Sequence, residues 1–194
     1  MSSVATKPSV AQPQPYRFSV EEYDRLGDVG FFQADDRVEL LDGEIFIMSP
    51  IGLRHMLATT WIAEWFSDRR NGRYAVSSSN PVQLHDHSEP QPDIALVPRV
   101  RQLRRKYPPE DLFLLVEVSD SSLGFDRTRK LKAYAQAGVR EYWIVNLDED
   151  VVEVFREAKG EKYAVALRFA LGESVAPLAF EDIQVPVADI IPPR

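Results

Sequence analysis

Two carboxylates and one lysine draw attention because each lies beside a segment expected to form regular structure. Asp93 directly precedes the apolar residues 94–97, and Glu117 lies in the largely apolar run 113–118. Lys130 follows in a segment with helical spacing. A carboxylate at the edge of a buried strand is costly unless it is paired, hydrogen-bonded or bound to a cation. Mg²⁺ usually takes only one or two protein carboxylates, so the set predicts a metal-dependent nuclease that aims water at a phosphodiester.

Each carboxylate also has a simpler structural explanation. A carboxylate at a strand end often caps neighbouring backbone or pairs with an arginine, and this chain has many arginines. Taken singly, Asp93 or Glu117 is better explained in that way, because single motifs prove little. The order of the two residues along the chain favours a shared site. If the two strands are neighbours, the start of one and the end of the next bring both carboxylates to one edge of the sheet.

Lys130 has two interpretations, one on the surface and one in a site. A lysine in a helix is ordinarily exposed to solvent. Lys130, however, lies early in the helix that follows Glu117, and its flexible stem could return the ammonium to a metal site. There it would orient or help to deprotonate the attacking water and offset negative charge on the phosphorane. Lys132 is a rival, but it points about 200° away around the helix, so only one of them can face the site.

Glu39 and His55 are candidate accessory residues. Glu39 stands between two apolar residues of a predicted strand, so alternation places it on the opposite face from its neighbours. It is either an ordinary exposed strand residue or a third carboxylate for a metal or its water. His55 lies at the start of a predicted helix, where a histidine usually caps or packs, but it could also accept a proton or orient a ligand.

These residues need elements that hold them together, and the sequence predicts one mixed sheet with flanking helices, an α/β (α+β) fold. Asp42-Gly43 accepts the positive φ angles of a type I′ turn, which predicts a hairpin of strands 37–41 and 44–48. Residues 112–118 are almost wholly apolar, as expected of a central strand buried on both faces. The other expected elements are helices 19–27, 55–70 and 126–137, an extended segment 74–84, and strands 93–97, 141–146, 151–157 and 163–169.

Composition favours a single compact domain. The chain has 194 residues, of which 44% are hydrophobic and 27% charged. It lacks cysteine, which excludes disulfides and thiolate zinc sites, and no apolar run approaches the ~18 residues that span a bilayer. Residues 1–15 contain three prolines and no apolar periodicity, so we expect a flexible tail before one domain at 16–194. That tail lacks the apolar region of a signal peptide, which makes the cytoplasm the expected location.

The charge distribution bears on the substrate. A net charge of −7 argues against the usual footprint of a nucleic-acid-binding protein. Two basic segments argue the other way, and they flank Glu117 in the sequence. Either could be an ordinary solvated surface, as charge runs usually are, or a phosphate contact. Their members are Arg99, Arg101, Arg104, Arg105 and Lys106 in the first segment, and Arg127, Arg129, Lys130 and Lys132 in the second.

Several motifs follow one another along the chain: Val38-Glu39-Leu40-Leu41-Asp42-Gly43-Glu44, His55, Gln91-Pro92-Asp93, Val116-Glu117-Val118-Ser119, Lys130-x-x-x-Tyr134 and Gly138-Val139-x-Glu141-Tyr142-Trp143. This succession resembles the Uma-type endonucleases, a bacterial family of the PD-(D/E)XK nuclease superfamily. The similarity covers about residues 16–190. The segment 137–143 is its most family-specific part, and we expect that segment to have a structural role.

The resemblance implies a restriction-endonuclease-like fold, a mixed central sheet flanked by helices with Mg²⁺ or Mn²⁺ at the active edge. It matches Asp93 to the family's metal-binding aspartate and Glu117 to its second acidic ligand. The superfamily pattern has lysine two residues after that glutamate, where this chain has Ser119. In this family the lysine has moved to the following helix, where Lys130 matches. Accessory positions of the family match Glu39 and His55.

Three hypotheses follow for the function. The first is a Mg²⁺-dependent phosphodiesterase that cuts nucleic acid, with DNA favoured over RNA. The second is a catalytically inactive module of the same fold that binds nucleic acid or protein, which the acidic net charge favours. The third is a metallohydrolase with another phosphate-bearing substrate. A homodimer is considered by analogy with the superfamily, and no membrane partner is expected.

Overall fold

The computed structural model describes residues 13–33, 35–100 and 106–194, and its centre is a six-stranded mixed sheet. The strand order is β3-β4-β5-β6-β7-β8. Only the β5–β6 pair is parallel, and every other neighbouring pair in this sheet is antiparallel. The strands are β3 (Ala75–Ser78), β4 (Ile94–Val97), β5 (Leu114–Ser119), β6 (Glu141–Asn146), β7 (Val151–Lys159) and β8 (Lys162–Ala170).

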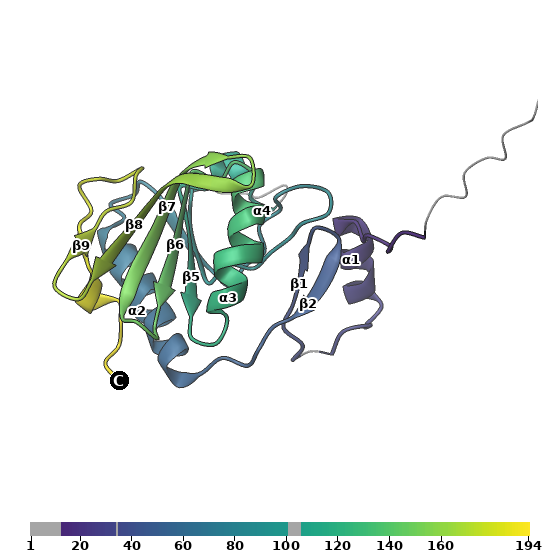
Figure 1. Cartoon of the computed structure of the whole chain (residues 1–194), viewed down its shortest axis with the longest axis horizontal. Coiled ribbons are helices and arrows are strands. Elements are labelled where there is room, and N and C mark those ends of the chain that lie inside the picture. Colours follow the sequence, from purple (N-terminus) through teal and green to yellow (C-terminus); the bar gives the residue numbers. More distant parts are fainter. Residues whose placement is uncertain (1–12, 34, 101–105) are drawn as a thin grey trace, which may run out of the picture.

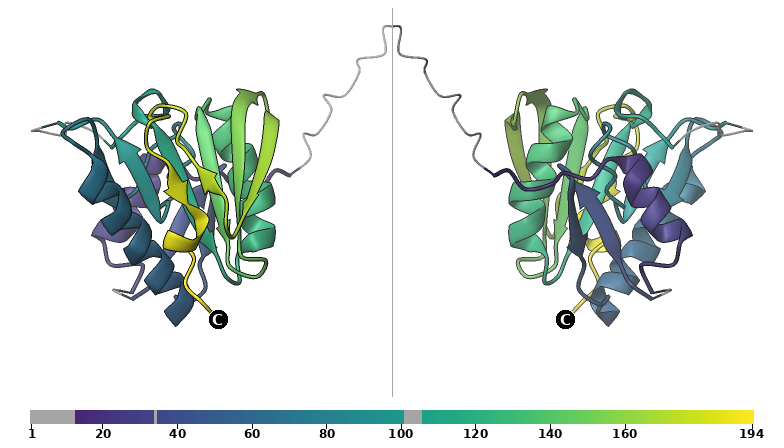
Figure 2. Two further views of the ribbon diagram at one scale, coloured as in Figure 1. Left: turned by 90° about the vertical axis from the view of Figure 1, so that its left-hand side faces the viewer. Right: turned by 90° about the vertical axis from the view of Figure 1, so that its right-hand side faces the viewer.

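Helices cover both faces of the sheet (Figures 1 and 2). On one face, α2 (Leu53–Arg69) packs with the C-terminal segment over a large apolar core. On the other face lies a helix that links β5 to β6, and it has a second core of its own. This helix runs continuously through α3 (Leu123–Phe125), one π turn at η2 (Asp126–Lys130) and α4 (Leu131–Gln136).

Strand β5 places its side chains alternately on these two faces. Leu114, Val116 and Val118 belong to the core under α2, whereas Leu115 belongs to the core under α4. Successive side chains of a strand point to opposite faces, so Glu117 is directed toward the helix that contains α4. The apolar strand thus buries a carboxylate on the helix side of the sheet.

A small N-terminal unit packs beside the main sheet (Figure 1). It consists of α1 (Val20–Asp28) and the hairpin β1 (Val38–Leu41) and β2 (Glu44–Ile47), with a separate small core. Ser19 caps α1 in a capping box with Glu22. The turn between the strands has positive φ at Asp42 and Gly43, 50° and 76°, as expected for type I′. A backbone hydrogen bond of 2.7 Å from the Glu89 amide to the Leu40 carbonyl ties the hairpin to the loop before β4.

The predicted fold class is confirmed, and most predicted elements lie within a few residues of their expected bounds. The helix expected at 126–137 begins three residues earlier, at Leu123, so Asp126 lies within it rather than at its start. The expected extended segment 74–84 is wrong in length, because regular pairing ends at Ser78 and only single bridges follow. Short pieces that the sequence did not predict are η1 (Pro109–Asp111), β9 (Ser174–Val175), β10 (Val185–Pro186) and η3 (Val187–Asp189).

Two sequence predictions concern parts of the chain outside the described residues. The tail expected at 1–15 is described only from residue 13, so the division into a tail and a domain at 16–194 stays a prediction. In the first basic segment, Arg101, Arg104 and Arg105 lie outside the described residues. Lys106 of that segment pairs with Asp24 and Glu89, at 2.9 and 2.5 Å. Across the described part of the chain, no helix is long and apolar enough to cross a membrane.

Candidate active site

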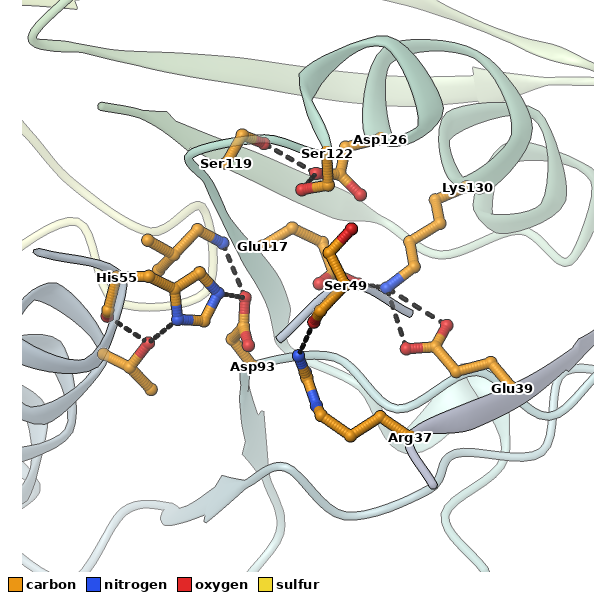
Figure 3. Close-up of polar contacts among 12 residues, drawn as sticks. Arg37, Glu39, Ser49, His55, Asp93, Glu117, Ser119, Ser122, Asp126 and Lys130 are labelled. Atoms are coloured by element: carbon orange, nitrogen blue, oxygen red, sulfur yellow. Dashed lines mark hydrogen bonds and ion pairs between the residues drawn. The ribbon is translucent and has the colours of Figure 1, made fainter. Parts of the chain in front are cut away.

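A buried lysine joins the hairpin to the central strand at the core of the candidate site (Figure 3). Nζ of Lys130 lies 2.9 Å from Oε1 of Glu117 and 3.2 and 3.1 Å from the two carboxylate oxygens of Glu39. Tyr134 donates a hydrogen bond of 2.7 Å to the same Oε1 of Glu117. Lys130 is only 1% exposed, so its surface interpretation is wrong. Glu39, beside Lys130, is also buried.

The helix geometry explains how Lys130 reaches the strand. Asp126, Lys130 and Tyr134 follow at intervals of four and are all buried on the side that faces β5. A π turn adds one residue to an α-helix and is frequent at functional sites. Lys132 points elsewhere, since its side chain is 44% exposed and pairs with Glu161 at 2.9 Å. Of the two rival lysines, Lys130 is therefore the one that faces the site.

Asp93 comes to the site because β4 and β5 are antiparallel neighbours. The register pairs Ile94 with Val116, which places the start of β4 beside the end of β5. Oδ2 of Asp93 accepts a hydrogen bond of 2.8 Å from the Val118 amide and lies 3.1 Å from Nε2 of His55. His55, near the start of α2, has Oγ1 of Thr59 3.4 Å from its Nδ1. The histidine and one backbone amide thus orient the aspartate.

Asp126 is a further buried carboxylate that the sequence reasoning missed. Its Oδ2 accepts hydrogen bonds from the hydroxyls of Ser119 and Ser122, at 2.7 and 2.6 Å. Ser119 occupies the position where the superfamily pattern has lysine, and its short side chain donates to Asp126 instead. The lysine of this chain enters from the helix. Spacing alone could have indicated Asp126, because it lies four residues before Lys130.

Burial and mutual repulsion shift the protonation of these carboxylates. Burial raises the pKa of Glu117 well above its usual range, Lys130 opposes the rise, and Asp93 adds to it. Burial likewise raises the pKa values of Glu39 and Asp126. Burial alone would lower the pKa of Lys130, but Glu117 and Glu39 outweigh it and the pKa rises. Lys130 is therefore an ammonium ion at neutral pH.

The residues described above line one small pocket. Its volume of about 40 Å³ leaves room for up to about three waters or an ion. All five residues predicted from the sequence contribute to it, so the structure brings them together. Arg37, two residues before Glu39 on the same extended segment, also lines the pocket, and the sequence reasoning missed it too. The lining includes Arg37, Glu39, His55, Asp93, Glu117, Asp120, Asp126 and Lys130.

Two of these carboxylates could hold a divalent cation. Oδ1 of Asp93 and Oε2 of Glu117 accept no hydrogen bond from the described residues, while the other oxygen of each group is engaged. Oε2 of Glu39 is in ion-pair range of Lys130, but its geometry leaves it without a hydrogen bond. Free carboxylate oxygens suit a hard ion such as Mg²⁺, which needs few protein ligands. Within the described ranges no group of three or more acidic, histidine or cysteine side chains is arranged to hold a metal.

Comparison with known proteins agrees with the predicted family and fold. The model of the Uma2 family, described as "Putative restriction endonuclease", matches residues 20–188. A similar solved structure is a "putative nuclease belonging to DUF820 from Anabaena variabilis ATCC 29413", with a TM-score of 0.69 at 13% sequence identity. The alignment covers 90% of this chain and 97% of that chain. At this identity the likeness shows a common fold. No curated protein matches the chain significantly.

Proposed function

Because the chain belongs to the Uma2 family of putative restriction endonucleases, we propose that it is a divalent-metal-dependent endonuclease that acts on DNA. The observation that carries the proposal is the meeting of Asp93, Glu117 and Lys130 in one pocket, from two neighbouring strands and the helix between β5 and β6. Location in the cytoplasm and a homodimeric state are further parts of the proposal, taken from the sequence analysis.

Asp93 and Glu117 would hold Mg²⁺ or Mn²⁺ through their free oxygens. When bound, such an ion supplies positive charge that makes water more acidic and offsets negative charge on the phosphate. The protein orients both ligands by binding the other oxygen of each carboxylate. The Val118 amide and His55 hold one oxygen of Asp93, and Lys130 with Tyr134 holds one oxygen of Glu117. Groups that orient metal ligands in this way usually matter almost as much as the ligands.

Lys130 would act through its charge. Since the carboxylates raise its pKa, it keeps its proton and is a poor acceptor for a proton from water. An ammonium fixed beside Glu117 instead stabilises negative charge that develops on the phosphate in the transition state. Of the two roles considered for Lys130, the structure favours charge compensation over deprotonation of water.

The competing function is a catalytically inactive binding module, and two observations favour it. No three-ligand cluster is found in the described part of the chain, and Ser119 replaces the usual lysine. A small metallohydrolase with another phosphate substrate is the third candidate. These three functions differ in what the protein binds and in what it cuts, so one set of assays separates them.

The test combines cleavage with metal binding. Single- and double-stranded DNA and RNA are incubated with the protein in Mg²⁺, Mn²⁺ or EDTA, and Mg²⁺ binding is measured by calorimetry. We expect DNA cleavage with either metal and none in EDTA. D93N and E117Q should fold, lose cleavage and bind Mg²⁺ more weakly. E161Q is the matched control, because Glu161 is 57% exposed and pairs with Lys132 on the surface.

Absence of cleavage with both metals, together with no Mg²⁺ binding that depends on Asp93, would refute the nuclease proposal. Binding of DNA without cleavage would favour the inactive module. Cleavage of a small phosphodiester but of no nucleic acid would favour the third candidate.

A further inference from the structure

The pocket presents a charge problem for a polyanionic substrate. Carboxyl groups outnumber cations among the groups that line it. A phosphate group that approaches this pocket meets repulsion unless a cation with free donors lies at the mouth. The carboxyl groups are those of Glu39, Asp93, Glu117, Asp120 and Asp126, and the two cations are Arg37 and Lys130.

Lys130 already pairs with two carboxylates of the protein. Its ammonium lies within 3.2 Å of oxygens from both Glu117 and Glu39, and the residue is buried. An ammonium has three donors. Two of them reach Glu39 and Glu117, and since the residue is only 1% exposed, Lys130 acts on a phosphate at the pocket mouth through its charge and not by direct contact.

Arg37 is the cation lining the pocket that has free hydrogen-bond donors. Its guanidinium donates one hydrogen bond, 2.7 Å from Nη1 to the Ser49 carbonyl (Figure 3). No carboxylate among the described residues forms an ion pair with it. An arginine has five donor hydrogens, so four of them stay free. Nearby arginines differ in this respect: Arg17 and Arg129 both pair with Glu44. Arg37 is also half-buried, so a substrate can reach it.

The position of Arg37 suits a phosphate contact. It lies two residues from Glu39, so both side chains extend from the same face of the β1 segment toward the pocket. The bond to the Ser49 carbonyl holds the guanidinium in place before any ligand arrives, which lowers the entropy lost on binding. The planar guanidinium can then bind two phosphate oxygens at once.

We propose that Arg37 is a substrate-binding residue that holds a backbone phosphate of the nucleic acid at the mouth of the carboxylate pocket. The proposal rests on the proposed nuclease function and adds a residue to it. The contact is independent of sequence, because a phosphate carries no base information. Arg37 would therefore contribute affinity and register, while Asp93 and Glu117 hold the metal.

The experiment measures DNA binding without cleavage. Fluorescence anisotropy of a labelled double-stranded oligonucleotide is recorded in EDTA at several salt concentrations, for the wild type, R37A, R37K and R37Q. R140A is the matched control: Arg140 is exposed, has no ion pair among the described residues, and precedes β6 at the end of the sheet away from Ser119. The control removes the same charge far from the pocket.

We expect R37A to bind about tenfold more weakly than R140A at low salt, with the slope of log K against log salt reduced by about 0.9. R37K should recover part of both quantities because it keeps the charge. R37Q should recover neither, although its amide can still donate to the Ser49 carbonyl. Thermal unfolding of all four variants measures whether they fold.

A merely structural role gives the opposite pattern, in which R37Q restores binding and R37K does not, and this would overturn the proposal. Binding by R37A equal to that of R140A, with an unchanged salt slope, would also overturn it while leaving the nuclease function intact. If R37A does not fold, R37K and R37Q decide the question by the same criteria. Failure of the wild type to bind or cut any nucleic acid would overturn both proposals together.

Discussion

Two buried glutamates on the adjacent parallel strands β5 and β6 have very different surroundings. Glu141, at the start of β6, is fully buried. Its Oε1 accepts hydrogen bonds of 2.8 Å from the Trp143 indole and 2.8 Å from Nε of Arg156. Its Oε2 accepts one of 2.5 Å from the Leu178 amide. Glu141 thereby ties β6 to β7 and to the C-terminal segment.

Glu117, at the other end of this strand pair, lacks an equivalent set of partners. One ammonium, that of Lys130, serves both Glu117 and Glu39, and Asp93 and Asp126 lie near enough to raise the pKa of Glu117 further. One oxygen of Glu39 has no hydrogen bond. Glu117 also lines the carboxylate pocket, and Glu141 is not among the residues that line it.

The comparison separates a buried carboxylate whose partners are all within the protein from one that suits the proposed metal site. Burial is common to both glutamates, so burial alone does not mark a site. Free acceptors and surplus negative charge facing a pocket distinguish Glu117, because folding alone would favour pairing every charge. Such a surplus is expected where a cation from solution completes the group.

The largest expected effect comes from exchanging the two carboxylates for amides. E117Q should lower the rate of DNA cleavage by about 10³-fold, since it removes a proposed metal ligand and the charge beside Lys130. E141Q should leave the rate of the folded enzyme unchanged but lower the free energy of unfolding by about 2–4 kcal/mol, because Arg156 loses its counter-charge. Steady-state cleavage and urea unfolding measure the two effects. The distinction between the glutamates fails if E141Q abolishes cleavage at unchanged stability.

The next effect tests whether the lysine serves several carboxylates. K130M should lower the free energy of unfolding at pH 8 by about 3–5 kcal/mol, because it leaves Glu39 and Glu117 buried without a cation. R156M should cost less, since that arginine is partly exposed and Glu141 keeps two neutral donors. Urea unfolding of both variants gives the comparison.

Adding E39Q to K130M provides the control. If one ammonium balances both carboxylates, removal of one carboxylate should recover part of the stability lost in K130M. Equal losses in K130M and R156M, with no recovery in the double variant, would show that the Lys130 group is as balanced as that of Glu141.

The sequence predicted the strands, and the meeting of Asp93 and Glu117 at one sheet edge, better than it predicted which cations pair with the buried carboxylates. Asp93 and Glu117 were expected at one sheet edge because apolar runs define β4 and β5, and the antiparallel register confirmed it. Lys130 was ambiguous because the spacing of a short helix does not show which of its faces packs on the sheet. Asp126 shares that face with Lys130, so the four-residue spacing identifies it only once Lys130 is known to face the sheet.

Other features had no local signal at all. Glu141 lies in the segment expected to be structural, and the structure supports that role, but its partners Arg156 and Leu178 come from distant parts of the chain. Arg37 looks like any charged strand residue until β1 packs against the helix that carries Lys130. Contacts between segments far apart in sequence leave no periodic pattern to read.

The smallest expected effect is the pH dependence of stability without metal. Glu39, Glu117 and Asp126 have raised pKa values in the folded state, so above pH 5 the folded protein binds more protons than the unfolded chain. Stability therefore falls as pH rises through the folded pKa values, at up to about 1.4 kcal/mol per pH unit for each excess proton. Carboxyls with lowered pKa values, such as Asp150, are ionised in both states above pH 5 and do not contribute.

Urea unfolding in EDTA between pH 6 and 8 measures this slope. E117Q should flatten it, because the amide carries no titrating proton. Mg²⁺ should reduce the fall in the wild type, since a cation bound by the ionised carboxylates favours the deprotonated folded state. A slope of zero in the wild type, or an unchanged slope in E117Q, would mean that the surplus charge around Glu117 is already neutralised within the folded chain. In that case the contrast between the two glutamates would rest on the pocket alone, and Asp93 would become the residue that decides whether a metal binds there.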